Sequence, residues 1–230
     1  MSIYMTAYMT AYMTEYTAVI VEPRKHPALS FVLKNVVTQL PNDWKILIFH
    51  GTQNGEFVKQ ILADLPNRFL NPIELEVDNL TVTQYNEVLM SSAFYKCIPT
   101  EIMLIFQTDT LILEPTQLDA FLSYDYVGAP WLTGGVGNGG FSLRNKTKML
   151  TITHTVRPFQ ANEDVYFSMQ RMVPLKKPTF QEAQKFSVES VFYEKPVGIH
   201  APWKYLNSYE MGVLIEKYPD IQRLMDLQGL

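Results

Sequence analysis

The feature that most constrains the fold is a regular alternation, from Thr17 onward, of short β-rich apolar runs with helical patterns. Such an alternation is typical of parallel strands joined by crossover helices. The clearest strands are predicted at residues 18–21, 45–49, 73–77 and 102–106, the last being the most central. We therefore expect an α/β fold with a mixed, mainly parallel sheet sandwiched by helices.

The remaining elements are predicted from apolar periodicity and breaker residues. Helices are expected at residues 26–40, 55–65, 83–95, 117–122, 146–154, 163–172 and 208–230, the last interrupted at Pro219. Further strands are expected at residues 111–113, 126–129, 140–143 and 188–193.

The first sixteen residues repeat a Tyr-Met-Thr-Ala unit with a four-residue period. This unit is too short for a solenoid, and the segment lacks the basic start and apolar core of a secretory signal. We interpret residues 1–16 as a low-complexity extension, and residues 17–230 as one domain. A chain of 230 residues that is 47% hydrophobic suits a single large core.

Charge, hydropathy and cysteine content exclude several classes of protein. The net charge of −4 comes without a basic stripe, so nucleic acid is not an expected partner. The longest apolar stretches, such as 46–49 and 102–106, are far shorter than the ~20 residues of a membrane helix. Cys97 is the only cysteine, which excludes an intramolecular disulfide and a cysteine-based zinc site. A reducing cytoplasm is the expected location.

Polar residues that directly follow strands are the first candidates for a site, because open α/β sheets bind ligands beyond the carboxyl ends of their strands. Three such places stand out in the sequence. The residues concerned are Glu22 and Arg24 after the first strand, Gln107, Thr108 and Asp109 after the central strand, and Asp125 to Trp131 with Asn138, Gly139 and Gly140 after a later one.

Each candidate has a structural reading beside the functional one. Asp109 either holds a divalent cation together with substrate phosphates, or caps a turn through nearby amides. Glu163 and Asp164 either begin a helix after Asn162, or one of them, preferably Asp164, acts as a general base. His200 is either a metal ligand or a hydrogen-bonded structural residue.

Aromatic and glycine-rich segments complete the candidates. Asp125, Trp131 and Trp203 are candidate platforms for a sugar or an acceptor, although a place in the core is the preferred reading of Trp203. Glycine occupies five of the seven positions of 134–140, which lets bare backbone approach a ligand. The segment runs into a strand pattern and matches no phosphate-binding fingerprint, so a kinase or dehydrogenase is excluded. A mobile loop is the alternative to a substrate-lining one.

The motifs also occur in a characteristic order along the chain. They are Phe106-Gln-Thr-Asp109, Tyr124-Asp-Tyr-Val-Gly-Ala-Pro-Trp131, Gly137-Asn-Gly-Gly-Phe-Ser-Leu-Arg144, Glu163-Asp-Val-Tyr-Phe167, Lys185-Phe-Ser-Val-Glu189 and His200-x-x-Trp203. Over residues 17–206 this order closely resembles a family known as a domain of unknown function, which is similar to the GT-A class of nucleotide-sugar glycosyltransferases.

The resemblance implies roles for individual residues. A GT-A enzyme carries a D-x-D motif after a central strand, and here Gln107-Thr108-Asp109 stands in its place. Asp109 keeps the metal role, whereas Gln107 departs from the pattern and lacks the first carboxylate. His200 matches a late metal ligand, and an Asp and His pair suits Mn²⁺ better than Mg²⁺. Glu163 or Asp164 would deprotonate the acceptor.

The donor-binding residues implied by the resemblance are Glu22, Arg24, Gln107, Thr108, Asn138, Gly139 and Gly140. The implied reaction moves a sugar from a nucleoside-diphosphate sugar to a glycan or another hydroxyl acceptor, with inversion or retention left open. Two alternatives remain. One is a catalytically weak nucleotide-sugar-binding or scaffold domain, which the missing first aspartate favours. The other is a metal-dependent nucleotidyltransferase, for which only Arg24 and Lys25 offer a basic triphosphate loop.

Overall fold

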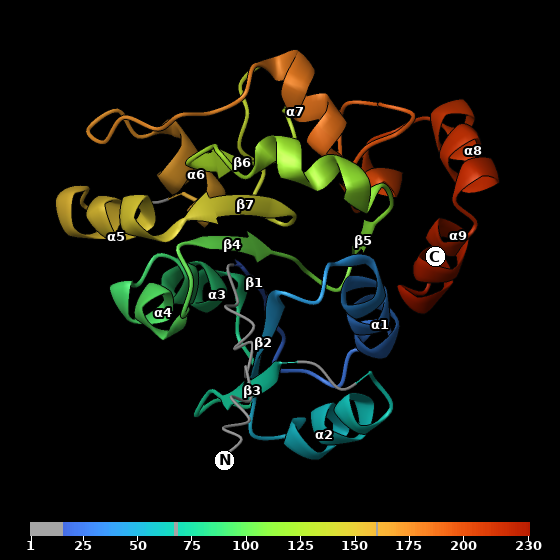
Figure 1. Cartoon of the computed structure of the whole chain (residues 1–230), viewed down its shortest axis with the longest axis horizontal. Coiled ribbons are helices and arrows are strands. Elements are labelled where there is room, and N and C mark those ends of the chain that lie inside the picture. Colours follow the sequence, from blue (N-terminus) through green and yellow to red (C-terminus); the bar gives the residue numbers. More distant parts are fainter. Residues whose placement is uncertain (1–15, 67–68, 160) are drawn as a thin grey trace, which may run out of the picture.

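A computed structural model describes residues 16–66, 69–159 and 161–230. The Tyr-Met-Thr-Ala repeat lies outside the described residues except for Tyr16, which begins the first strand. The described chain forms an α/β fold around two sheets, with helices on both sides of the larger one (Figure 1).

The larger sheet has six strands in the order β3-β2-β1-β4-β7-β6. Its members are β1 (Tyr16–Val21), β2 (Trp44–His50), β3 (Leu70–Glu74), β4 (Ile102–Ile105), β6 (Tyr126–Val127) and β7 (Ser142–Asn145). The strands β3, β2, β1 and β4 run parallel to one another, whereas β7 is antiparallel to β4 and to β6. The sheet is therefore mixed and mainly parallel, as the sequence predicts, and β4 shares its centre with β1.

Helices cover both faces of this sheet (Figure 1). The helices of the described residues are α1 (Leu29–Gln39), α2 (Gly55–Ala63), α3 (Val82–Leu89), α4 (Ser92–Cys97), α5 (Lys146–Thr155), α6 (Glu163–Met169), α7 (Phe180–Phe186), α8 (Ser208–Lys217) and α9 (Asp220–Leu227), with 3-10 turns η1 (Pro115–Phe121) and η2 (Pro202–Lys204). Figure 1 shows α1 and α2 on the side of the sheet opposite to α4 and α5.

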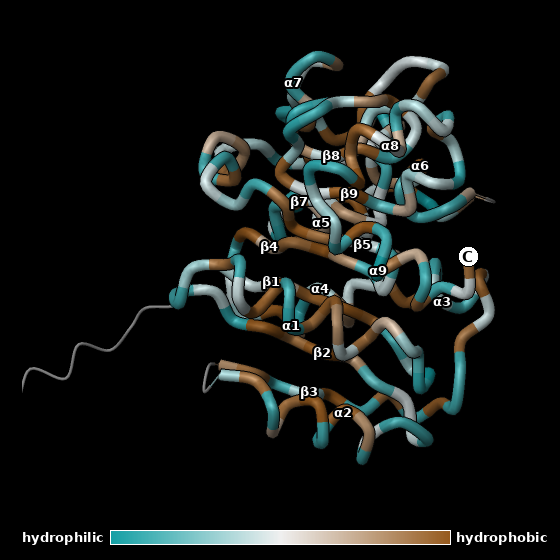
Figure 2. Tube along the Cα trace, turned by 90° about the vertical axis from the view of Figure 1, so that its right-hand side faces the viewer, coloured by the Kyte–Doolittle hydropathy of each residue, from teal (hydrophilic) through white to brown (hydrophobic). Residues whose placement is uncertain are grey.

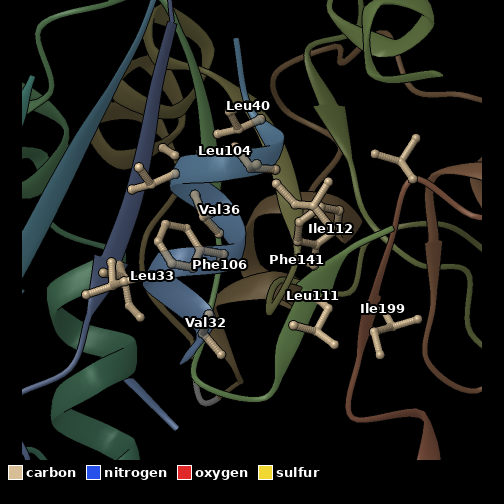
Figure 3. Close-up of a cluster of buried hydrophobic side chains, with 14 of the residues drawn as sticks. Val32, Leu33, Val36, Leu40, Leu104, Phe106, Leu111, Ile112, Phe141 and Ile199 are labelled. Atoms are coloured by element: carbon tan, nitrogen blue, oxygen red, sulfur yellow. The ribbon is translucent and has the colours of Figure 1, made fainter. Parts of the chain in front are cut away.

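The central strands are apolar on both faces, which explains their continuous apolar runs. Along β1, Ala18 and Ile20 pack into one core while Val19 and Val21 pack into the other. Figure 2 shows the resulting hydrophobic colouring of β1, β2 and β4. The larger core lies between the sheet and α1 and extends to the second sheet (Figure 3).

The second sheet is small but decides where the site forms. It contains β5 (Thr110–Ile112), β9 (Gly198–His200) and β8 (Ser187–Val188) in that order. The strands β5 and β9 are antiparallel, with Thr110 opposite His200. Because Asp109 directly precedes Thr110, this pairing brings Asp109 next to His200 despite their distance in sequence.

Several predicted elements are wrong in extent. The third strand spans Leu70–Glu74 instead of 73–77, and the long helix predicted at 83–95 is two helices. The Ser91 hydroxyl accepts a hydrogen bond from the Phe94 amide at 3.2 Å and so begins α4, which the apolar period alone did not reveal. The helix predicted at 163–172 ends at Met169, where Gln170 adopts an extended conformation.

The region before His200 differs most from the prediction. The strand predicted at 188–193 is reduced to β8, while α7 and β9 were not predicted. Helix α7 begins at a capping box in which Thr179 and Glu182 bond to each other's backbone amides. Within the described ranges, no helix combines the length and the apolarity needed to cross a lipid bilayer.

Candidate active site

A cavity of about 540 Å³ lies beyond the carboxyl ends of β1 and β4. All the predicted site residues line it except Asp125, Trp131 and Trp203. The lining includes Glu22, Arg24, Gln107, Thr108, Asp109, Asn138, Gly139, Gly140, Glu163, Asp164 and His200. These residues come from distant parts of the chain, so the fold gathers them into one place.

Asp109 and His200 face each other in this cavity. The Asp109 Oδ1 and His200 Nε2 atoms are 3.3 Å apart, and the Lys204 ammonium lies 3.3 Å from Asp109 Oδ2. Asp109 Oδ1 is buried and its geometry gives it no hydrogen bond. A buried carboxylate oxygen without a hydrogen bond is costly, and a bound cation would satisfy it.

Glu189 lies on the opposite side of the His200 ring. Its carboxylate is 3.2 Å from His200 Nδ1 and accepts a hydrogen bond of 2.7 Å from the Asn138 amide. Gln107 Oε1 is 3.2 Å from His200 Nε2. The Nε2 of Gln107 donates a hydrogen bond to the Tyr85 hydroxyl at 2.9 Å. The imidazole is thus held between two carboxylates, in the way that a neighbouring carboxylate orients a metal-binding histidine.

The two carboxylates set the ionisation of this cluster. Burial opposes charge on the ring, but contacts with Asp109 and Glu189 outweigh it and raise the pKa of His200 to about 9. Burial likewise opposes charge on Asp109, yet His200 and Lys204 lower the pKa of its carboxyl below the ordinary range. A cation that binds here has to displace the proton of His200, because the ligating imidazole is neutral.

Two glycines allow the wall of the cavity to approach these side chains. A Cβ atom added at Gly140 would lie 2.3 Å from His200 Nε2. One added at Gly139 would lie 2.2 Å from a Glu163 oxygen. The backbone here therefore has no room for a side chain. The earlier glycines of the segment, Gly134 to Gly137, are not among the residues that line the cavity.

Glu163 and Asp164 are neighbours with different surroundings. Both oxygens of Glu163 accept hydrogen bonds from the buried Arg144 guanidinium, at 2.7 and 3.0 Å. Glu163 is therefore committed to a structural ion pair. Asp164 has no such partner, and burial together with the adjacent Glu163 raises the pKa of its carboxyl. A partly buried carboxyl with a raised pKa is the better candidate for a general base.

Glu22 and Arg24 form a second pre-arranged pair at the end of β1. Glu22 accepts hydrogen bonds from Arg24 Nε at 2.8 Å and Nη2 at 2.7 Å, as well as from its backbone amide. The side chain of Asn54 donates to the carbonyls of both residues. Glu22 thus orients Arg24, whose guanidinium remains the group able to meet a phosphate.

The remaining predicted residues are not brought to the cavity. Asp125 binds the Lys176 backbone amide at 2.7 Å and lies 3.8 Å from the Lys148 ammonium. Trp131 lies beside Gly135 and Gly137 within the glycine-rich loop. Trp203 is partly buried and packs against the larger core. Asp125 thus closes a loop, and neither tryptophan lines the cavity.

Sequence reasoning assigned no role to Glu189, Lys204 or Arg144. Glu189 follows β8 directly, so the rule that polar residues after strands build the site applies to it once that strand is known. Arg144 lies inside an apolar strand pattern, and a buried arginine has no distinctive signal in one sequence. No group of three or more histidine, cysteine, aspartate or glutamate side chains with metal-binding geometry occurs among the described residues.

A family described as a protein of unknown function, DUF5672, matches residues 72–200, which is more than half of the chain. The chain belongs to the DUF5672 family. The matched segment of this DUF5672 protein contains Asp109, Asn138, Glu163, Asp164 and His200, whereas Glu22 and Arg24 precede it. No curated protein sequence matches the chain.

Solved structures place the DUF5672 chain among GT-A glycosyltransferase folds. The apo form of glycosyltransferase GlyE from Streptococcus pneumoniae TIGR4 has a TM-score of 0.59 at 13% identity, covering 93% of this chain and 62% of GlyE. Galactosyltransferase LgtC, solved with donor and acceptor sugar analogues, has a TM-score of 0.57 at 10% identity and covers 93% of this chain and 95% of LgtC.

A third similar structure contains a metal. Mannosyltransferase PcManGT from Pyrobaculum calidifontis, in complex with GDP-Man and Mn²⁺, has a TM-score of 0.52 at 12% identity, covering 74% of this chain and 55% of that one. The DUF5672 chain thus spans 62% of GlyE and a smaller share of PcManGT. At these identities the likeness establishes the fold and a distant similarity to nucleotide-sugar glycosyltransferases.

Proposed function

We propose that this protein transfers a sugar from a nucleoside-diphosphate sugar to a hydroxyl acceptor with the help of a divalent cation. The observation that carries the proposal is the convergence of Asp109, His200 and Asp164 on one cavity beyond the carboxyl ends of β1 and β4. The GT-A fold supports it, because this region is where open α/β sheets bind ligands.

Asp109 and His200 are suited to hold the cation. Asp109 Oδ1 is buried without a hydrogen bond, and His200 Nε2 lies 3.3 Å away. With these two protein ligands, the other ligands would be phosphate oxygens of the donor and water. The imidazole nitrogen favours Mn²⁺ over Mg²⁺. When bound, the cation would neutralise the negative charge that develops on the diphosphate leaving group.

The chain's own residues provide the remaining functions. Arg24, oriented by Glu22, offers a second positive charge to the donor. Gly139 and Gly140 leave the space in which the Glu163 and His200 side chains lie against the cavity wall. Asp164 accepts the proton of the acceptor hydroxyl. At the same time the acceptor oxygen bonds to the anomeric carbon, and the bond from that carbon to the diphosphate breaks.

The decisive experiment starts with binding. A thermal-shift screen of UDP, GDP, UDP-glucose, UDP-galactose and GDP-mannose, each with and without Mn²⁺, identifies the donor, because a ligand that binds the native state raises the unfolding temperature. A donor that passes this screen is incubated with sugar acceptors, and the products are measured by mass spectrometry. Failure of every nucleotide to shift the unfolding temperature would contradict the proposal.

Asp164→Asn tests whether Asp164 is the general base. The variant keeps nearly the same shape but cannot accept a proton, so turnover should fall by about 10²- to 10⁴-fold while donor binding persists. Equal loss of binding and turnover would remove Asp164 from the proposed role.

One observation favours a second function, a nucleotide-sugar-binding domain without turnover. Gln107 stands where the GT-A pattern has a carboxylate, and its side chain is engaged by Tyr85 and His200. The same experiments separate the two functions. Binding of a nucleotide sugar without release of nucleoside diphosphate, with or without acceptors, would support the binding domain.

A further inference from the structure

The buried side chain of Arg144 reaches both walls of the cavity. Arg144 lies on β7 and is fully buried. Its Nη2 donates to the Gly139 carbonyl at 3.3 Å and to Glu163 Oε1 at 3.0 Å. Gly139 belongs to the glycine-rich wall, whereas Glu163 begins α6. One guanidinium thus joins the two walls.

Every N–H group of this guanidinium is used. Nη1 donates to Glu163 Oε2 at 2.7 Å and to the Tyr95 hydroxyl at 3.2 Å. Nε donates to the Ser142 hydroxyl at 3.0 Å, which in turn donates to the Gly139 carbonyl at 2.9 Å. A lysine lacks the planar fork that these partners require.

The rings on either side keep the group in place. The centroids of Tyr126 and Phe167 lie 5.2 and 5.6 Å from the guanidinium carbon. Burial and a cationic charge are compatible here because the Glu163 carboxyl group pairs with Arg144 at 2.7 Å. A satisfied buried charge with this number of partners is rigid.

Asp164 is attached to both groups that Arg144 holds. It is the chain neighbour of Glu163, and the Gly139 backbone also packs against it, since a Cβ atom added at Gly139 would lie 2.9 Å from the Asp164 Cβ. The Oδ1 of Asp164 accepts a hydrogen bond from the Val165 amide at 2.7 Å. The Asn86 side chain holds the Glu163 amide at 2.8 Å. The position of Asp164 therefore depends on Arg144 through two separate routes.

We infer that Arg144 is a positioning residue that holds Asp164 in its reactive place through Glu163 and Gly139. The inference rests on the role of Asp164 in the proposed function. Glu163 is then a part of the same positioning pair and not a second base. Small displacements of a reacting group are costly, since a shift of about 1 Å can lower the rate by about 100-fold.

The charged and titratable groups facing Asp164 give a second measurable consequence. They are Glu163 on α6, Arg144 on β7 and Tyr126 on β6. Burial and Glu163 raise the pKa of Asp164, whereas the Gly139 and Val165 amides and Arg144 lower it. A lysine at position 144 would keep the positive charge but lose the hydrogen bond that holds the Gly139 carbonyl. This change should therefore raise the pKa of Asp164 further.

Arg144→Lys is the main test. The charge persists but the fork is lost, so kcat should fall by about 100-fold, with little change in the KM for the donor found in the nucleotide-sugar screen. The carboxyl of Asp164, followed by carbon NMR and assigned with Asp164→Asn, should titrate at higher pH. Arg157→Lys, at an exposed position after α5, is the matched control and should change none of these values.

The double variant Arg144→Met with Glu163→Leu separates position from stability. Replacing both partners of a buried ion pair by hydrophobic residues of similar volume is often close to neutral for stability. The double variant should therefore remain folded while kcat stays low. This variant also carries the test if Arg144→Lys does not fold.

The outcomes distinguish this inference from the proposed function. Wild-type kcat and an unchanged Asp164 titration in a folded variant that lacks Arg144 would overturn the inference. Absence of sugar transfer by the wild-type protein with any donor would instead overturn the proposed function, and the NMR titration alone would then decide whether Arg144 positions Asp164.

Discussion

Two buried charged clusters beside the same cavity differ in one respect. In the Arg144–Glu163 cluster, every guanidinium N–H and both carboxylate oxygens have hydrogen-bond partners. In the Asp109–His200 cluster, the oppositely charged groups are 3.3 Å apart, yet Asp109 Oδ1 and His200 Nδ1 lack well-aligned hydrogen bonds. The first cluster is complete, because the protein supplies a hydrogen-bond partner for each of these polar groups. The second cluster is incomplete, because two of its buried polar atoms lack one.

This difference separates a structural cluster from the proposed binding site. A complete ion pair gains nothing from a ligand, whereas buried polar atoms without partners gain a great deal. We therefore expect changes in the first cluster to act on stability and geometry, and changes in the second to act on ligand binding.

The largest effect is expected from breaking the complete cluster. Glu163→Ala leaves the Arg144 charge buried without its partner, which should lower the free energy of unfolding by about 3–5 kcal/mol. Urea denaturation measures the loss. Glu216→Ala, at an exposed position on α8, is the control and should stay within about 0.5 kcal/mol of wild type. A loss no larger than that of the control would contradict the comparison.

The incomplete cluster should respond to Asp109→Asn through binding. The amide preserves the shape and hydrogen-bonding capacity but removes the negative charge that a cation needs. We expect the Mn²⁺-dependent part of nucleoside-diphosphate affinity to fall by at least ~100-fold, the upper end of what loss of an indirect metal partner costs. Isothermal titration calorimetry with UDP and GDP measures it.

Asp119→Asn, at an exposed position in η1, is the control for the charge change. Asp109 contacts both His200 and Lys204, and an alanine would remove both contacts. The asparagine variant is therefore preferable to alanine. Unchanged Mn²⁺-dependent affinity in a folded Asp109→Asn protein would remove the metal assignment.

A smaller effect is expected from moving the histidine. In Gly140→Ala the new methyl group would lie 2.3 Å from His200 Nε2, so the ring must shift. The Mn²⁺-dependent affinity should fall by about tenfold. Gly212→Ala on α8 is the matched control, because its Cβ meets nothing within 4 Å and should stabilise the helix by about 0.5–1 kcal/mol. Identical affinities in the two variants would show that His200 does not bind the cation.

The smallest expected effect is that of Asp164→Asn on the unfolding temperature. Its raised pKa means that the folded protein binds this proton more tightly than the unfolded chain does. The ionised form therefore reduces stability as the pH rises above the ordinary aspartate pKa. Asp164→Asn removes this effect and should unfold at a higher temperature than wild type at neutral pH, with the difference disappearing in acid. A lower unfolding temperature at neutral pH would contradict the assignment.

The sequence predicted the fold well because its central strands are apolar on both faces and are separated by clear helical periods. It failed where secondary structure is decided by local capping, as at Ser91 and Thr179, or by strand pairing between distant segments. Strand β9 has three residues, so its apolar pattern is too short to distinguish it from a loop.

Prediction of the site was uneven for a related reason. The rule that polar residues follow strands led to Asp109, Arg24 and Asn138, all of which line the cavity. It also led to Asp125, whose carboxylate instead binds the Lys176 amide. Sequence cannot show whether an acidic side chain points into a cavity or is already neutralised, which is the difference between Asp164 and Glu163.

The pairing of β5 with β9 has a consequence for the order in which the protein is made. The core strands β1, β2 and β4 are complete once about half of the chain has been translated, but His200 joins Asp109 only when β9 docks on β5. A nascent chain would thus possess its main scaffold well before the proposed metal site could form. Shortened forms that stop before β9 would lack the strand pairing that brings His200 to Asp109.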